Sequence, residues 1–137
     1  MAANALVLKA LEHHRGGRLA NAEELYRQAI AADKRDFDAL NLLGALMIQR
    51  GAFEGAHDLL RQAVKLRPGN PDATLRLATD QRALGDEVRA EQSYRKLLQM
   101  APNFADGHYS LAVSLRETGR LAEAQQHLDI ARRLGKR

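Results

Sequence analysis

The side chains best suited to metal binding or acid–base catalysis in this sequence are its five histidines: His13, His14, His57, His108 and His127. No two of them stand four residues apart on one predicted helix, which is the spacing that a helical zinc site needs. Glu123 and His127 have that spacing, but two ligands alone are more typical of a solvated helix face than of a metal site. We therefore predict no metal site.

Other catalytic patterns are missing as well. The sequence has no cysteine, which excludes disulfides, thiolate zinc sites and cysteine nucleophiles. It also lacks a glycine-rich phosphate loop, a nucleophile elbow and the metalloprotease helix motif. A chain of 137 residues is about one domain, and a short helical array offers no closed pocket that excludes water. We predict that the protein is not an enzyme and takes no cofactor.

Composition and charge narrow the class of protein further. Apolar residues make up 45% of the chain and charged residues 28%, which is typical of a globular protein. The apolar stretch of residues 5–8 stops at Lys9, too early for a signal-peptide core or a spanning helix, so we expect a soluble cytoplasmic protein. The net charge of +4 equals that of Arg132, Arg133, Lys136 and Arg137 at the end of the chain. Since the rest is neutral, we expect neither nucleic acid nor a membrane as partner.

A 34-residue internal repeat organises the whole chain. Three kinds of residue recur at this interval: the glycines Gly17, Gly51, Gly85 and Gly119, the alanines Ala22, Ala56, Ala90 and Ala124, and the large residues Tyr26, Leu60, Tyr94 and Leu128. The predicted repeats span residues 3–36, 37–70, 71–104 and 105–137, and together they form one domain.

Each repeat contains two predicted helices. In the second repeat, apolar residues recur with helical spacing up to Met47, Gly51 ends that helix, and the spacing restarts at Phe53. Asn70 and Pro71 are typical of the next helix start. This pattern predicts helices near residues 3–15, 19–32, 37–49, 53–66, 71–83, 87–100, 105–117 and 121–134, and no strands.

Small residues recur where the two helices of each repeat should cross. They are Ala10, Gly44, Ala78 and Ala112 on the first helices, facing the alanine series on the second helices. Such residues let helix axes approach to about 8–9 Å. Stacked pairs predict an all-α, right-handed solenoid of eight antiparallel helices, with the first helices lining its concave side.

These residues resemble the signature of the tetratricopeptide repeat, a helix-turn-helix unit, in four tandem copies. The resemblance rests in the second repeat on Leu43, Gly44, Gly51, Phe53, Ala56, Leu60, Ala63 and Pro68, and later on Pro102, Gly119, Leu121, Ala124, Leu128 and Ala131. The first repeat departs at Lys9 and His13. In the third, Glu87 replaces a large apolar residue, and Val88 is expected to fill part of its place.

The resemblance implies a non-enzymatic scaffold that holds a partner peptide in its concave groove. A second reading also stays open, in which the chain is a targeting or assembly module of a larger bacterial enzyme such as a glycosyltransferase or sulfotransferase. The ligand sites of two better-defined subfamilies are not matched. The carboxylate clamp of the heat-shock co-chaperones would fall on Val7, Leu11, Leu42, Asp72 and Arg76, and the asparagine ladder of the O-linked N-acetylglucosamine transferases on Leu8, Leu42, Arg76 and Ser110.

The groove residues follow from helical geometry, because positions 2, 5, 9 and 12 of a repeat share one side of its first helix. The predicted peptide-binding residues are Asn41, Ala45, Ile48, Leu75, Thr79, Arg82, Tyr109, Val113 and Arg116, with His14 at one edge. Arg82 and Arg116, both predicted exposed, would pair with an acidic segment of the partner. The alternative is that they only complement helix dipoles, as do the aspartates in the first turns. Tyr109 is the best single contact candidate.

The last predicted helix carries an apolar residue at an outer position. Ile130 stands where the other repeats have Gln28, Gln62 and Lys96. This replacement predicts a surface that is covered, since stacked repeats normally end in a polar capping helix. Two explanations are open: a capping helix beyond this chain, or end-to-end packing of two copies.

Overall fold

The computed structural model describes residues 2–135, with side chains from residue 4 onward. Lys136 and Arg137, which carry half of the basic tail, lie outside the described residues. The described part contains eight α-helices and no strand, and none of these helices is both long and apolar enough to cross a membrane. The chain forms two compact units, Met1–Pro68 and Gly69–Arg137, each holding four helices.

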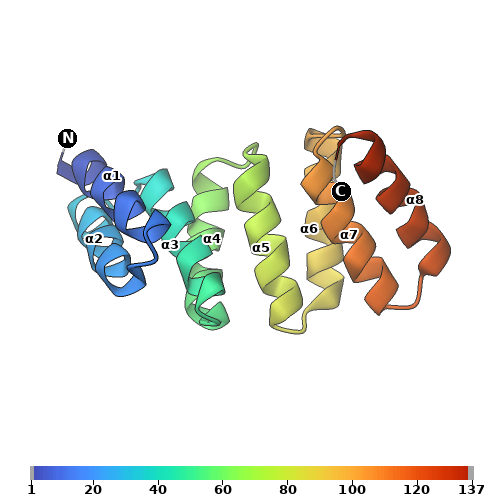
Figure 1. Cartoon of the computed structure of the whole chain (residues 1–137), viewed down its shortest axis with the longest axis horizontal. Helices are drawn as coiled ribbons and strands as arrows, with labels where there is room; N and C mark the ends of the chain where they lie inside the picture. Colours follow the sequence, from blue (N-terminus) through green and yellow to red (C-terminus); the bar gives the residue numbers. More distant parts are fainter. Residues whose placement is uncertain (1, 136–137) are drawn as a thin grey trace. The chain divides into compact units, whose positions relative to one another are not determined.

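Unit 1 consists of two helical hairpins (Figure 1). Helix α1 (Ala2–Arg15) packs against α2 (Leu19–Ala32), and α3 (Phe37–Gln49) packs against α4 (Phe53–Leu66). Helix α3 also contacts both α1 and α2, so the two first helices lie side by side.

Unit 2 repeats this arrangement with four more helices (Figure 1). Helix α5 (Pro71–Ala83) packs against α6 (Glu87–Met100), and α7 (Ala105–Glu117) packs against α8 (Leu121–Arg133). Helix α7 also contacts α5 and α6. In both units the observed ends of the helices agree with the predicted ends to within one residue.

The helix ends explain the recurring glycines. After α3, Gly51 has a φ of +76°, a conformation that glycine adopts without steric penalty. Its N–H donates to the Ile48 carbonyl at 2.9 Å, and the N–H of Ala52 donates to the Met47 carbonyl at 2.8 Å. The predicted start of α5 is also confirmed, because the Asn70 side chain accepts a hydrogen bond from the Ala73 N–H at 3.0 Å.

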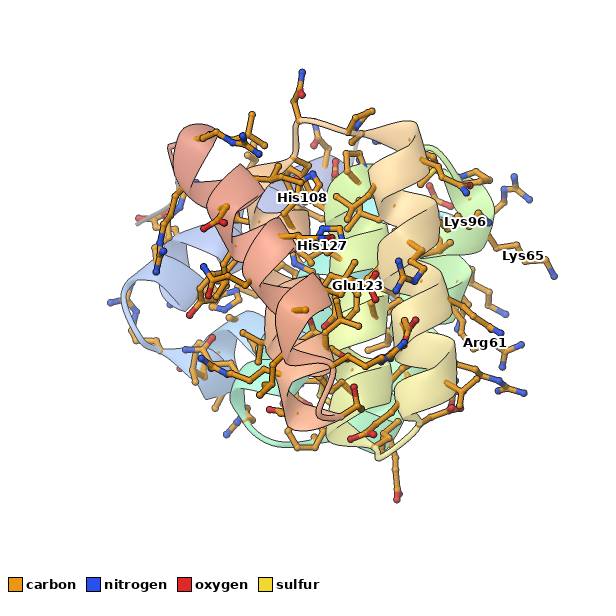
Figure 2. The ribbon with its side chains drawn as sticks, turned by 90° about the vertical axis from the view of Figure 1, so that its right-hand side faces the viewer. Arg61, Lys65, Lys96, His108, Glu123 and His127 are labelled. Atoms are coloured by element: carbon orange, nitrogen blue, oxygen red, sulfur yellow. The ribbon has the colours of Figure 1, made fainter. Side chains whose placement is uncertain are left out.

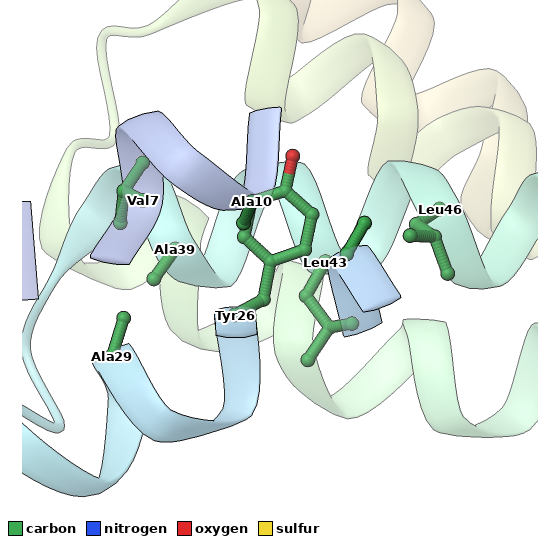
Figure 3. Close-up of a cluster of buried hydrophobic side chains, with 8 residues drawn as sticks. Val7, Ala10, Tyr26, Ala29, Ala39, Leu43 and Leu46 are labelled. Atoms are coloured by element: carbon green, nitrogen blue, oxygen red, sulfur yellow. The ribbon is translucent and has the colours of Figure 1, made fainter. Parts of the chain in front are cut away.

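The core of unit 1 joins small residues to one large ring. Tyr26 is fully buried among Ala10, Val7 and Leu43 (Figure 3). Both predicted small-residue series are buried in this unit as well, as expected for close helix crossings. At Gly44 the packing is tightest, since a Cβ placed there would lie 2.5 Å from a methyl carbon of Leu60.

Unit 2 has a matching core around Tyr94, which is also fully buried. The other members of this cluster are Ala78, Ala90, Leu111, Leu115 and Ala124. The expectation for Val88 is wrong: this side chain is 71% exposed at the start of α6 and fills no core space. Ile130 on α8 is half-buried.

Candidate functional site

The predicted peptide-binding residues of unit 2 come from its two first helices, which are neighbours. Helix α5 carries Leu75, Thr79 and Arg82, and α7 carries Tyr109, Val113 and Arg116. We call these six residues the first-helix face of unit 2. Its apolar members Leu75 and Val113 are half-buried, whereas Arg116 and Tyr109 are exposed.

The two arginines of this face lie in different environments. Arg82 is paired within the unit: its Nη1 donates to Glu117 Oε1 at 3.1 Å, and only 26% of its side chain is exposed. The prediction that Arg82 is exposed is therefore wrong. Its Nε is buried and has no hydrogen-bond partner among the described residues. An incoming carboxylate would have to compete with Glu117 for Arg82, whereas Arg116 is exposed and makes no ion pair with any described residue.

Two further members of the face differ: Thr79 is bonded within the unit, and Tyr109 is exposed. The Thr79 hydroxyl donates to the Leu75 carbonyl at 2.9 Å and lies 3.4 Å from the Tyr94 hydroxyl, so its hydrogen-bonding capacity is used within unit 2. Tyr109 remains 40% exposed, and it is the largest side chain that this face presents. A partially exposed tyrosine ring offers apolar surface to a partner.

In unit 1, none of the predicted peptide-binding residues is exposed. Asn41 on α3 is only 7% exposed, and its Oδ1 has no hydrogen-bond partner among the described residues. Ala45 and Ile48 are half-buried on the same helix. His14 on α1 is held by the fold, because its Nδ1 lies 3.1 Å from the Tyr26 hydroxyl and its Nε2 lies 3.0 Å from Gln49 Oε1.

A pair of histidines in unit 2 went unnoticed in the sequence. The rings of His108 on α7 and His127 on α8 are stacked, with their centroids 5.3 Å apart and their Nδ1 atoms 3.0 Å apart. Glu123 lies one turn before His127 on α8 (Figure 2). Because His108 Nε2 donates to the Pro102 carbonyl at 2.7 Å, neutral His108 accepts at Nδ1 and His127 donates there.

Burial and the neighbouring His108 lower the pKa of His127 below its ordinary value. His127 Nε2 lies 3.9 Å from Glu123 Oε2, and the His127 side chain is only 17% exposed. The interpretation of Glu123 and His127 as a solvated pair is therefore wrong for His127. Among the described residues, no group of three histidine, cysteine or acidic side chains could hold a metal ion.

The second helices of unit 1 form a basic surface that the sequence reasoning also missed. A hollow of about 290 Å³ is lined by Lys34, Arg35, Gln62, Lys65 and Leu66. A second hollow of about 260 Å³ shares Lys34 with it and is lined further by Arg27, Ile30, Ala31 and Leu59. We call the two together the α2–α4 hollow. The sequence contains one signal of this surface. The next two repeats have Pro68 and Pro102 at the position where the first repeat has the cationic Lys34.

The repeat geometry has a clear counterpart among known protein families. Two family models described as tetratricopeptide repeat match residues 7–71 and 93–126, which together make up more than half of the chain. The chain belongs to the tetratricopeptide repeat family. This result confirms the resemblance found in the sequence.

Two curated relatives are identical to this chain at about a third of the aligned residues. It is 31% identical over 106 residues to the peroxisomal targeting signal receptor of Eremothecium gossypii, a match that covers 77% of this chain and 19% of the receptor. It is 34% identical over 120 residues to cellulose synthase operon protein C of Xanthomonas axonopodis pv. citri, covering 82% of this chain and 8% of that protein. The chain thus spans less than a fifth of the length of either relative.

Solved structures confirm the all-α, helical-repeat fold. The structure of MamA matches with a TM-score of 0.88 at 20% identity, covering 96% of this chain and 77% of MamA. PilF of Pseudomonas aeruginosa matches with a TM-score of 0.90 at 22% identity, covering 99% of this chain and 62% of PilF. At these identities the likeness concerns the fold alone.

Proposed function

We propose that this chain is a non-enzymatic, cytoplasmic protein-interaction module whose first-helix faces bind an acidic peptide segment of a partner protein. The first-helix face of unit 1 consists of Asn41, Ala45 and Ile48 on α3. The observation that carries the proposal is the first-helix face of unit 2. There an exposed arginine, Arg116, and a 40% exposed tyrosine, Tyr109, share α7, and half-buried apolar side chains stand on α5 and α7.

Each residue type on this face suits a different part of a peptide. Leu75 and Val113 offer half-buried apolar surface for an aliphatic side chain. The Arg116 guanidinium can donate two parallel hydrogen bonds to a carboxylate. Tyrosine and arginine are also among the residue types enriched in the energetically dominant contacts at protein interfaces. The match to a protein named as a targeting signal receptor agrees with segment recognition.

Arg82 acts as a second, conditional cation in this proposal. A peptide carboxylate near Arg82 must displace Glu117 or share the guanidinium with it. Removing the charge of Glu117 should therefore strengthen binding of an acidic peptide, because Arg82 then lacks its internal counter-ion. Arg82→Glu is a poor test, since it would place two carboxylates side by side and destabilise the unit.

The test is a random-peptide display selection on the purified chain, followed by affinity measurements with the enriched peptides. We expect a convergent acidic motif whose affinity falls at least about tenfold in Arg116→Glu and rises in Glu117→Gln. Arg133→Glu is the matched control, because it makes the same charge change at an exposed arginine on α8 of the same unit. Equal weakening by Arg116→Glu and Arg133→Glu, or no convergent motif, would refute the proposal.

A second candidate function is that of a targeting or assembly module within a larger bacterial enzyme. The observation that favours it is the length of the relatives, since this chain covers only 8% of a bacterial cellulose synthase operon protein. The two functions are compatible. The second function is tested on the complete gene product. If the chain is a module of an enzyme, deleting residues 3–135 should leave the chemical activity intact and abolish the association with a partner.

A further inference from the structure

We propose that the α2–α4 hollow is a second binding surface, which takes an acidic segment of a partner protein that carries aliphatic side chains. The hollow lies on the second helices of unit 1 and on the loop that follows α2. None of its residues belongs to the first-helix faces, so the proposal does not depend on the function proposed above.

The charge of the hollow has one sign. Four of its lining residues are cationic, namely Arg27, Lys34, Arg35 and Lys65, and none is acidic. Arg27 donates to Glu23 at 3.0 Å, whereas no ion pair joins Lys34, Arg35 or Lys65 to an acidic side chain of the described residues. Lys65 projects outward from α4 together with Arg61 one turn before it (Figure 2). These cations therefore complement an acidic partner.

Helix dipoles do not explain Lys34 and Arg35. Cations at a helix C-terminus compensate the macrodipole, and this effect accounts for Lys65, which lies in the last turn of α4. However, α6 is the counterpart of α2 in unit 2, and it has the same length of 14 residues without a basic residue in its last turn. It is followed by Pro102 and Asn103 where α2 is followed by Lys34 and Arg35. The fold thus forms this helix end without cations.

The floor of the hollow favours a peptide over a nucleic acid. Ile30 and Leu59 are half-buried and pack on the core cluster of unit 1, and Leu66 is half-buried beside them. These residues give a firm apolar surface on which an aliphatic side chain can rest. No aromatic residue lines the hollow, so unpaired bases have no ring to stack on.

The test measures the fluorescence anisotropy of a labelled heptapeptide in which glutamate and leucine alternate, titrated with the full chain. Wild type should bind it saturably below about 1 mM. The double variant Lys34→Glu/Lys65→Glu should weaken binding at least about tenfold, because two attractive contacts become repulsive. Its matched control is Lys9→Glu/Lys96→Glu, which makes the same change in net charge at two exposed lysines on α1 and α6.

Two more measurements identify the surface and the ligand class. Arg116→Glu should weaken binding of this heptapeptide less than Lys34→Glu/Lys65→Glu does, which separates the hollow from the first-helix face. An oligouridine of about ten nucleotides should bind at least about tenfold more weakly than the heptapeptide. The proposal is overturned by any of three results: no saturable binding of the heptapeptide, equal weakening in both double variants, or an oligouridine that binds as tightly and competes with the heptapeptide.

Discussion

The tightest helix crossing in unit 1 makes a quantitative prediction about Gly44→Ala. A Cβ at Gly44 on α3 would lie 2.5 Å from Leu60 Cδ2 and 2.7 Å from its Cγ. Leu60 on α4 is fully buried, so its side chain has no open space into which it can move. Alanine gains about 1 kcal/mol over glycine in helix propensity. Overpacking of a well-packed core costs about 1–3 kcal/mol, and the second effect should win.

We therefore expect Gly44→Ala to lower the free energy of unfolding by about 1 kcal/mol and the Tm by about 3–6 °C. The matched control is Gly55→Ala on α4, where the new Cβ meets only the flexible end of Met47, at 2.6 Å. Since that methyl group can move aside, Gly55→Ala should be neutral or slightly stabilising. Thermal melts followed by circular dichroism at 222 nm, the helix signal, would measure both.

A double-mutant cycle tests whether contact with Leu60 causes the destabilisation by Gly44→Ala. Leu60→Val removes a methylene from the contact, and by itself it should cost about 1 kcal/mol. Combined with Gly44→Ala, it should cost less than the sum of the two single changes, because the smaller side chain makes room for the Cβ. A Gly44→Ala protein that melts at or above the wild-type temperature, or strictly additive costs in the double mutant, would refute the packing argument.

Two further predictions concern charge in unit 2. The pKa of His127 is lowered in the fold, so the unfolded chain binds the proton more readily, and stability should fall as the pH drops from about 6.5 towards the lowered pKa. His127→Gln should lose less free energy of unfolding than wild type between about pH 7.5 and about pH 5.5; equal losses in denaturant titrations would contradict this. Glu91 receives hydrogen bonds from Arg120 and Arg95, which lower its pKa. Ionised Glu91 therefore contributes to the free energy of unfolding above its unfolded-state pKa, and this contribution disappears as the pH falls through the lowered pKa. Glu91→Gln should destabilise the protein by up to about 1 kcal/mol near neutral pH and not at low pH, and a loss that high salt does not reduce would argue against an ionic origin.

Much of the fold was predictable because its signals are local. The position of Gly51 sets the end of α3, since the left-handed backbone that follows a helix favours glycine. Asn70 sets the start of α5 through a bond that spans three residues. The 34-residue interval then carries these signals through four repeats, so the helices were placed without knowledge of their neighbours.

Local patterns failed where a neighbouring side chain decides the outcome. Val88 was expected to replace a core residue one position away, but a shift of one position on a helix turns a side chain by about 100°, and Val88 faces solvent. The spacing of the sequence placed Arg82 on the first-helix face, but it did not predict the residue that pairs with Arg82. Glu117 lies 35 residues further along the chain and meets Arg82 only because α5 and α7 pack side by side.

The sequence alone thus determined the eight helices, their ends, the crossings of small residues and the family, because helical periodicity and capping act over a few residues. Only the tertiary structure decided which polar groups meet. The stacked pair His108 and His127 and the basic α2–α4 hollow both bring together residues of different helices. The physical reason is that a repeat pattern assigns each side chain to a face of its own helix. The chemistry of that side chain depends on the residues that a neighbouring helix places opposite it.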